Sequence, residues 1–187
     1  GIKWKKLALL GHRAMGTCEV HYDVVKASEI EALGPIGGGW QGLMEYITTE
    51  RLCLSAARTG AAAAALKLAL DHAKERIQFG RPIGKFQAVS HMLTEMHTLV
   101  DTARLQVYRF AWLVSQGKEG RIEAATPKLF AGEAYKKVSD LGVQVMGAYG
   151  YSAEFPMERH YRDARLATIG AGTSEIQRNI IAKELGL

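Results

Sequence analysis

The spacing of apolar residues divides the chain into a short amino-terminal part and a long remainder. Before Pro35, apolar and polar residues alternate in short runs, such as the segment from Cys18 to Val24, and glycines separate these runs. An alternation of period two predicts strands, and the glycines predict turns between them. From Trp40 onward, apolar residues recur every three or four positions, which is the period of an amphipathic helix. The pattern predicts a β-rich stub followed by helices.

The first predicted helix runs from Trp40 to about Ile77 and is rich in alanine. Alanine favours helix, and its small side chain lets neighbouring helices approach closely. We therefore expect this helix to be the central one. Two glycines and Pro82 predict a loop after it.

Further stretches with the helical period predict a bundle. The helix after Arg121 must hold Pro127 in its first turn, because a proline deeper in a helix removes a backbone hydrogen bond. Thr173 is expected to cap the last helix. The predicted fold is mainly α, an antiparallel helical bundle preceded by a short β-rich segment. The remaining predicted helices cover 86–117, 121–145, 157–167 and 174–185.

Composition narrows the function classes. With 187 residues, 48% hydrophobic and 23% charged, the chain is long and apolar enough for one main folded domain. The net charge of +5 is spread along the chain, which argues against a nucleic-acid partner. The most apolar run, 61–70, is interrupted by Lys67 and is too short to span a bilayer, so no membrane association is expected.

The two cysteines, Cys18 and Cys53, are isolated, which predicts neither a disulfide scaffold nor a zinc site. We therefore expect an intracellular protein, located in the cytoplasm, or in the mitochondrial matrix in a eukaryote. No histidine pair has metal-binding spacing, so no metal is predicted. Because the chain begins without Met, we expect further sequence upstream.

Glu50 is the most informative acidic residue. It shares a helical stripe with Ile47 and Leu54, which predicts that its carboxyl group faces the interior. Burial raises the pKa of a carboxyl group toward neutrality, where it becomes useful as a general base. The alternative is a structural ion pair with Arg51 or Arg58.

Two loops carry the residue types of an anion site. The segment 76–87 combines arginines with glycines, which suits a diphosphate and equally suits a tight turn between helices. The segment 169–175 is a glycine-rich entry to a helix, where free N–H groups attract anions or polarised carbonyl groups. Capping alone explains this segment equally well.

These features, in this order, resemble the acyl-CoA dehydrogenase family over essentially the whole chain. The segment 76–87 resembles the family's Arg-x-x-Phe-Gly-x-x-Ile-x-x-Phe-Gln loop. The segment 144–150 resembles its Gln-x-x-Gly-Gly-x-Gly turn, with Ala148 in place of a glycine. The segment 172–178 resembles its terminal helix signature.

The resemblance implies two domains and a cofactor. Residues 1–35 would end the middle β-domain, and residues 36–187 would form the C-terminal helical bundle through which the family makes dimers or tetramers. The implied cofactor is FAD, much of which would be contacted by another subunit. The FAD-binding residues that the resemblance implies are Arg76, Phe79, Gln87, Gln144, Val145, Met146, Gly147, Ala148, Thr173, Ser174 and Glu175.

The resemblance also assigns the base. Most medium- and short-chain members carry their catalytic Glu where this chain has Ala171. Isovaleryl-CoA and long-chain dehydrogenases carry it on the long helix before the arginine loop, and the segment 48–52 resembles that arrangement. Glu50 is then the catalytic base. The implied acyl-CoA-binding residues are Thr48, Thr49, Arg51, Leu54, Leu166, Gly170, Ala171 and Gly172.

The implied reaction is α,β-dehydrogenation of an acyl-CoA thioester, in which Glu50 removes the α-proton while the β-hydride passes to the flavin. The N–H of Ala171 and a flavin hydroxyl would hold the thioester carbonyl. A short or branched acyl group is favoured, although Ala167 and Thr168 replace a Tyr-Glu pair of the isovaleryl-CoA enzyme, which leaves straight or longer chains open. An electron-transfer flavoprotein is the implied acceptor, and oxygen is the alternative.

The rival function is a non-catalytic helical module for oligomerisation, inactive by itself. Because the resemblance covers only part of the family's architecture, we expect the isolated chain to be colourless or weakly loaded with flavin. The visible spectrum of the purified chain distinguishes the two.

Overall fold

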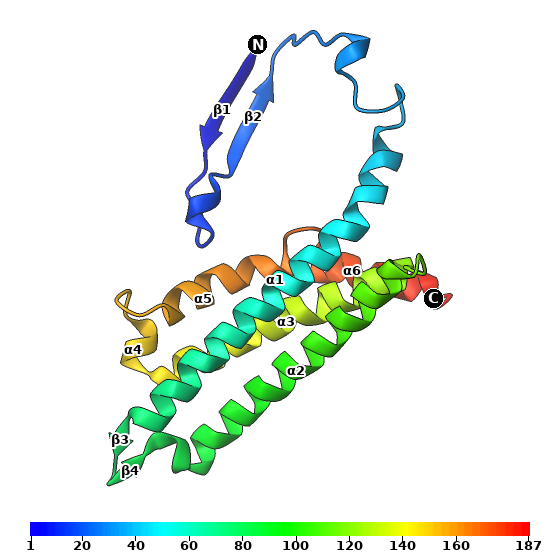
Figure 1. The fold of residues 1–187 in the computed structure, drawn as a ribbon. Coiled ribbons are helices and arrows are strands. Elements are labelled where there is room, and N and C mark those ends of the chain that lie inside the picture. The colour runs from blue at the N-terminus through cyan, green and yellow to red at the C-terminus, as the bar shows by residue number, and fades with distance from the viewer.

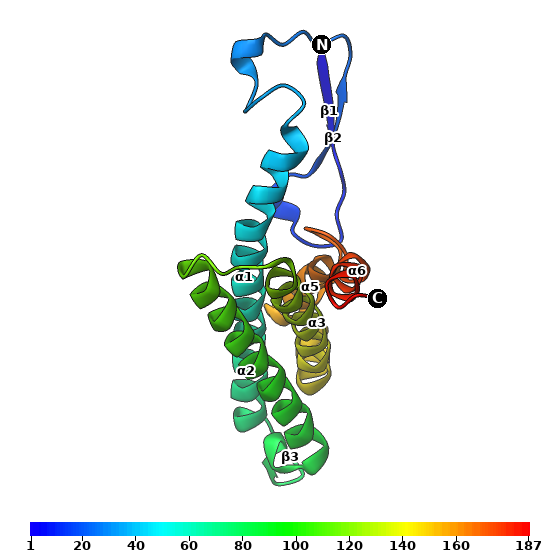
Figure 2. The same cartoon turned by 90° about the vertical axis from the view of Figure 1, so that its right-hand side faces the viewer.

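The computed structural model describes the backbone of all 187 residues and every side chain except that of Glu45. It confirms a mainly helical fold, in which three long antiparallel helices form the bundle (Figures 1 and 2). The helices are α1 (Gly39–Glu75), α2 (Gln87–Ser115), α3 (Arg121–Met146), α4 (Ala148–Tyr151), α5 (Met157–Ala164) and α6 (Ser174–Glu184), with short 3₁₀ turns at η1 (Arg13–Met15), η2 (Glu29–Glu31), η3 (Ile83–Lys85) and η4 (Arg165–Thr168). The strands are β1 (Ile2–Lys6), β2 (Cys18–Tyr22), β3 (Ile77–Gln78) and β4 (Arg81–Pro82).

The central helix is α3, not the alanine-rich α1 that the sequence suggested. Helices α1 and α2 pack on one side of α3, and α5, η4 and α6 pack on the other. Two glycines allow the close approach on that second side. A Cβ atom at Gly132 would lie 2.6 Å from the carbonyl oxygen of Ala167, and one at Gly142 would lie 2.6 Å from the side chain of Met157. Close packing on both sides makes α3 the core of the bundle.

Pro127 lies in the second turn of α3, so the prediction that it occupies the first turn is wrong. The proline has no N–H to donate to the carbonyl group of Glu123. The neighbouring Thr126 hydroxyl donates to the carbonyl oxygen of Ile122 (2.8 Å), which adds a hydrogen bond at the same level of the helix. The ring itself is buried in the bundle, so packing favours it.

Helix α1 is longer than the bundle that it joins. Its buried residues begin at Ser55, and its small side chains from Ala62 to Ala73 pack against α2 and α3. The earlier turns stand away from the other helices (Figure 1). By length and composition alone α1 meets the criterion for a membrane span, as core helices of soluble proteins also do.

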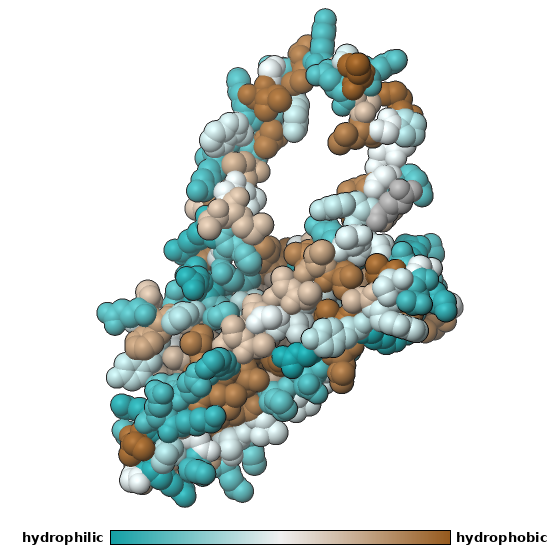
Figure 3. All heavy atoms as spheres, in the orientation of Figure 1, coloured by the Kyte–Doolittle hydropathy of each residue, from teal (hydrophilic) through white to brown (hydrophobic). Residues whose placement is uncertain are grey.

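The N-terminal hairpin touches the bundle through one loop. Strands β1 and β2 pair antiparallel, with Ile2 opposite Tyr22, and both are largely exposed. The loop between them reaches α5, where the N–H of His12 donates to Asp163 Oδ1 (2.6 Å) and Arg162 Nη1 donates to the carbonyl oxygen of Leu10 (3.2 Å). Figure 3 shows open space between the hairpin and the first turns of α1. The hairpin is therefore held at one point only.

Replacing Asp163 with Ala should release this hairpin loop. The variant loses a hydrogen bond from a backbone N–H to a carboxylate, a class of bond that contributes roughly 1.5–3 kcal/mol. Trypsin cleavage after Arg13 in the full-length protein should therefore become about tenfold or more faster. Asp140→Ala, an exposed carboxylate on α3, serves as the control. Equal cleavage rates in the two variants would contradict the proposed anchor.

Candidate active site

The loop between η4 and α6 is tied to the two helices beside it. Arg58 of α1 donates through Nη2 to the carbonyl oxygen of Gly170 (3.5 Å). Lys128 of α3 donates through Nζ to the carbonyl oxygen of Gly172. Residues far apart in sequence thus hold the loop from both sides.

A third side chain completes the arrangement. Gln177 of α6 donates through Nε2 to the carbonyl oxygens of Ala171 (3.4 Å) and Gly172 (3.1 Å). The peptide bonds here are trans, so each N–H points opposite to the carbonyl group of its own peptide unit. Because the carbonyl groups of residues 170–172 face inward, the N–H groups of residues 171–173 face away from the three side chains.

Ala171 has a strained backbone. Its φ is +55°, in the left-handed region, and that of Gly172 is +84°. For a residue with a Cβ this conformation costs roughly 1–2 kcal/mol. Among the residues that the structure describes, the N–H of Ala171 has no acceptor. The strained peptide therefore presents a free donor.

The cations behind the loop are buried. Lys128 is 1% exposed and Arg58 is 9% exposed, and no carboxylate among the described side chains lies within 4.0 Å of either. Burial lowers the pKa of Arg58, and the Glu50 carboxylate partly opposes that shift. Burial, with the charges of Arg58 and Arg51, lowers the pKa of Lys128 to about 8. The loop is thus backed by buried positive charge that no carboxylate within 4.0 Å neutralises among the described side chains.

Sequence reasoning missed the roles of Lys128 and Gln177. A signal for Lys128 was present, because it lies on the buried face of its helix with Ala124, Ala131 and Tyr135. A lysine at such a position needs a hydrogen-bond acceptor. The sequence does not reveal which acceptor it finds.

Glu50 lies on the part of α1 that extends beyond the bundle. Its side chain is half-buried. The prediction that its stripe of apolar residues faces the interior is wrong, since Leu43 is 47% exposed and Ala57 is also exposed. Its carboxylate has no ion pair within 4.0 Å among the described side chains, so the alternative of a close pair with Arg51 or Arg58 is not observed.

The other predicted acyl-CoA residues surround the same end of the bundle at different depths. Thr48 and Leu54 are half-buried on α1, whereas Thr49 is exposed. Leu166 of η4 is 39% exposed, and Gly170 is half-buried beside Arg58. The structure therefore brings α1 and the loop together through Arg58.

Most of the predicted FAD-binding residues, namely Arg76, Phe79, Gln87 and 144–148, lie at the opposite end of the bundle, around β3, β4 and α4 (Figure 1). Phe79 and Gly80 form a two-residue hairpin turn with φ of +51° and +77°. The Phe79 ring is 92% exposed. Arg76 stacks on the ring of Tyr149, 5.8 Å from its centroid.

The glycine turn after α3 presents its backbone outward. Gln144, Gly147 and Ala148 are exposed, whereas Val145 and Met146 are 5% and 6% exposed and contribute their side chains to the core. Any ligand contact from these two must come through the backbone. The sequence did not predict the short helix α4 that follows. No group of three metal-ligating side chains occurs in the part of the chain that the structure describes.

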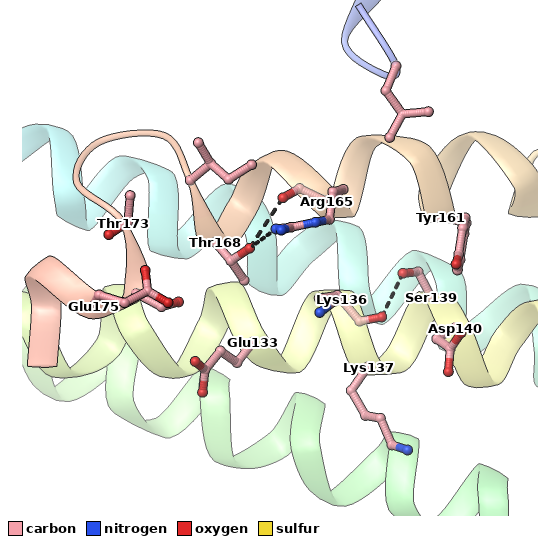
Figure 4. Close-up of a pocket in the computed structure, with 13 residues that line it drawn as sticks. Glu133, Lys136, Lys137, Ser139, Asp140, Tyr161, Arg165, Thr168, Thr173 and Glu175 are labelled. Carbon is pink, nitrogen blue, oxygen red and sulfur yellow. Dashed lines mark hydrogen bonds between the residues drawn. The ribbon is translucent and has the colours of Figure 1, made fainter.

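A groove of about 760 Å³ lies between α3, η4 and α6 (Figure 4). It is bordered by Thr173, Ser174 and Glu175, but not by Glu50. The Thr173 hydroxyl accepts a hydrogen bond from the N–H of Ile176 (3.3 Å), which confirms Thr173 as the N-cap of α6. The Ser174 side chain is nearly enclosed. Volume alone therefore does not identify the reaction site.

Known proteins resemble the chain over almost its full length. It is 40% identical to an acyl-CoA dehydrogenase of Bacillus subtilis (strain 168), over 99% of this chain and 48% of that protein. It is also 40% identical to the mitochondrial isovaleryl-CoA dehydrogenase of Oryza sativa subsp. japonica, over 97% of this chain and 44% of that protein. The crystal structure of an acyl-CoA dehydrogenase from Geobacillus kaustophilus superposes with a TM-score of 0.97 at 34% identity, covering 100% of this chain and 50% of that one.

The chain thus spans about half the length of the relatives that it matches. Residues 37–186 match the family model described as acyl-CoA dehydrogenase, C-terminal domain. The chain therefore belongs to the acyl-CoA dehydrogenase family.

Proposed function

We propose that this chain supplies the base and a carbonyl-binding loop for α,β-dehydrogenation of an acyl-CoA thioester. The observation that carries the proposal is the strained loop at Ala171, whose N–H is free and faces away from the side chains that hold the loop. A backbone N–H in this setting stabilises the negative charge that develops on a thioester oxygen when the α-proton leaves.

In this proposal Glu50 is the catalytic base. Its carboxylate takes the α-proton, and the pair of electrons from that C–H bond forms the new double bond as the β-hydrogen departs as hydride. FAD, when bound, supplies the acceptor for that hydride. Arg58 links the two parts of the site, because it contacts Gly170 and interacts with the Glu50 charge.

The residues at the far end of the bundle fit a dinucleotide. Arg76 has a guanidinium without a carboxylate within 4.0 Å among the described side chains, and guanidinium suits phosphate oxygens. The exposed amides of Gln87 and Gln144 suit the edge of a nucleobase. The Phe79 ring offers an uncovered aromatic surface beside them. This donor set supports the proposal that FAD binds here.

One chain contributes to two ends of the bundle, which supports a homo-oligomer. Lys128, which contacts the loop, and Gln144 are 16 positions apart on α3, which is about 24 Å along the axis. We propose that each flavin is completed by the far end of another subunit, in a dimer or tetramer. Size-exclusion chromatography with light scattering on the full-length protein measures that state.

Residues 1–35 are proposed to end a β-domain that continues outside this chain. The hairpin and its linker leave large apolar side chains uncovered: Trp4 is 68% exposed, Ile30 is 93% exposed and Leu33 is 100% exposed. Apolar groups of this size are normally covered in a folded protein.

For the substrate we propose a short or branched acyl-CoA, with an electron-transfer flavoprotein as electron acceptor. The isovaleryl-CoA relative supports the branched class, and the half-buried Leu54 with the small Gly170 supports a pocket of modest size. The non-catalytic module is the rival, because only part of the site lies in this chain.

The decisive experiment mixes the full-length flavoprotein with butyryl-, isovaleryl- and palmitoyl-CoA without oxygen and follows the flavin absorbance. We expect bleaching within seconds by the short or branched substrate, with formation of the corresponding enoyl-CoA. A flavin that none of the three substrates bleaches would favour the non-catalytic module.

A further inference from the structure

Lys128 is a buried cation that folding alone does not explain. It is 1% exposed, lies in the third turn of α3, and has no carboxylate partner within 4.0 Å among the side chains described. Burying an ammonium group without a counter-ion destabilises a protein. An apolar side chain of similar length would fill the same space without that cost.

Its hydrogen-bond partner suggests what it contributes. Lys128 donates to the carbonyl oxygen of Gly172, the residue directly after Ala171. Arg58 holds the carbonyl group of Gly170, the residue directly before it, and Gln177 donates to the carbonyl groups of both Ala171 and Gly172. The strained residue is therefore fixed on both sides.

Strain of this kind persists only where the surroundings enforce it. Without the Lys128 ammonium group, the Gly172 carbonyl group is held only by Gln177 Nε2 at 3.1 Å, and Ala171 can relax from its φ of +55° toward an ordinary conformation. Such a change rotates the peptide units on either side and turns the N–H of Ala171 away from its present direction. Position 172 itself requires glycine, since its φ is +84° and a Cβ there would lie 2.8 Å from Gln177 Nε2.

We propose that Lys128 is a positioning residue for the reaction: by holding the carbonyl group of Gly172 it keeps the Ala171 N–H aimed at the thioester oxygen. The inference rests on the proposed function and deepens it. Lys128 touches neither substrate nor cofactor and acts through the loop alone. Its buried charge is retained although it lowers stability, because activity requires the loop geometry.

The test is Lys128→Met in the full-length, flavin-loaded enzyme. We expect kcat for the best acyl-CoA to fall about 10- to 100-fold, because small displacements of an oxyanion donor have effects of this size. The dissociation constant of the enoyl-CoA product, measured by the change in flavin absorbance, should change less than about threefold. The midpoint of thermal unfolding at pH 7 should stay equal or rise, because a buried charge has been removed.

The pH dependence of stability gives an independent measurement. The charges around Lys128 are Arg51 and Arg58 from α1, which lower its pKa to about 8, and Glu133 and Glu175, which oppose them. A lysine with a lowered folded-state pKa binds fewer protons when folded than when unfolded, between pH 8 and about 10.5. Wild-type stability should therefore rise relative to Lys128→Met across that range.

Lys67→Met, an exposed lysine on α1 paired with Asp71, is the matched control and should keep the wild-type kcat. If Lys128→Met lowers the unfolding midpoint together with kcat, Lys128 is only structural and the inference fails. Unchanged kcat also overturns it. Lys128→Gln provides the same comparison should the methionine variant not fold. The proposed function is tested separately: if acyl-CoA bleaches the wild-type flavin, that function is supported even where the inference about Lys128 fails.

Discussion

Glu50→Gln in the full-length flavoprotein is expected to lower the rate of flavin reduction by acyl-CoA by about 10²- to 10⁴-fold. The amide keeps the size and hydrogen-bonding atoms of the side chain but cannot accept the α-proton at neutral pH. The carboxylate has no ion pair within 4.0 Å among the described side chains, so its loss breaks no such contact. The variant should therefore fold and remain yellow.

Stopped-flow absorbance of the flavin measures this rate, and the visible spectrum before mixing reports the flavin content. Glu95→Gln, an exposed residue of α2 that pairs with Lys137 at 3.8 Å, is the control and should reduce its flavin at the wild-type rate. Flavin reduction by Glu50→Gln within about threefold of wild type would rule out Glu50 as the base. Loss of flavin from this variant would instead indicate a structural role.

Phe110→Ala should have the largest effect on stability. The ring is fully buried on α2, 0% exposed, and is the largest side chain enclosed in the bundle. Its removal leaves a cavity between rigid helices, which typically costs 3–5 kcal/mol. The midpoint of chemical unfolding of the full-length protein should fall accordingly.

Tyr108→Ala on the same helix is the matched control, because its ring is 64% exposed. The expected cost is below about 1 kcal/mol. Circular dichroism at the helix band follows both transitions. If the two variants unfold at the same denaturant concentration, the core does not lie where the structure places it.

The relation between sequence and structure differs from helix to helix. Helices α1 and α2 were both predicted within a few residues, because the alanine content of α1 and the apolar spacing of α2 act through neighbours a few positions apart. Pro127 was misplaced, since a rule for isolated helices does not anticipate the Thr126 hydroxyl and the buried packing around the ring. The helix α4 was missed because its four residues carry no full period.

The candidate site shows the same division. The lack of an acidic residue at position 171 and the order of the motifs are properties of the sequence. The family could therefore be recognised, and Glu50 proposed as the base, without coordinates. The prediction that the apolar stripe around Glu50 is buried was wrong. Periodicity shows which residues share a face of a helix, but not whether another element covers that face. In this chain the first turns of α1 have no covering helix.

By itself, then, the sequence determined the helical fold, the position of Ala171 and the choice of Glu50 as the candidate base. Only the tertiary structure decided that α3 is the central helix, that Glu50 is half-buried, and that Lys128 holds Gly172 from 44 positions away. The physical reason is range: helical period and capping depend on neighbours a few residues apart. The direction of a strained peptide depends on side chains from three helices, which meet only after packing.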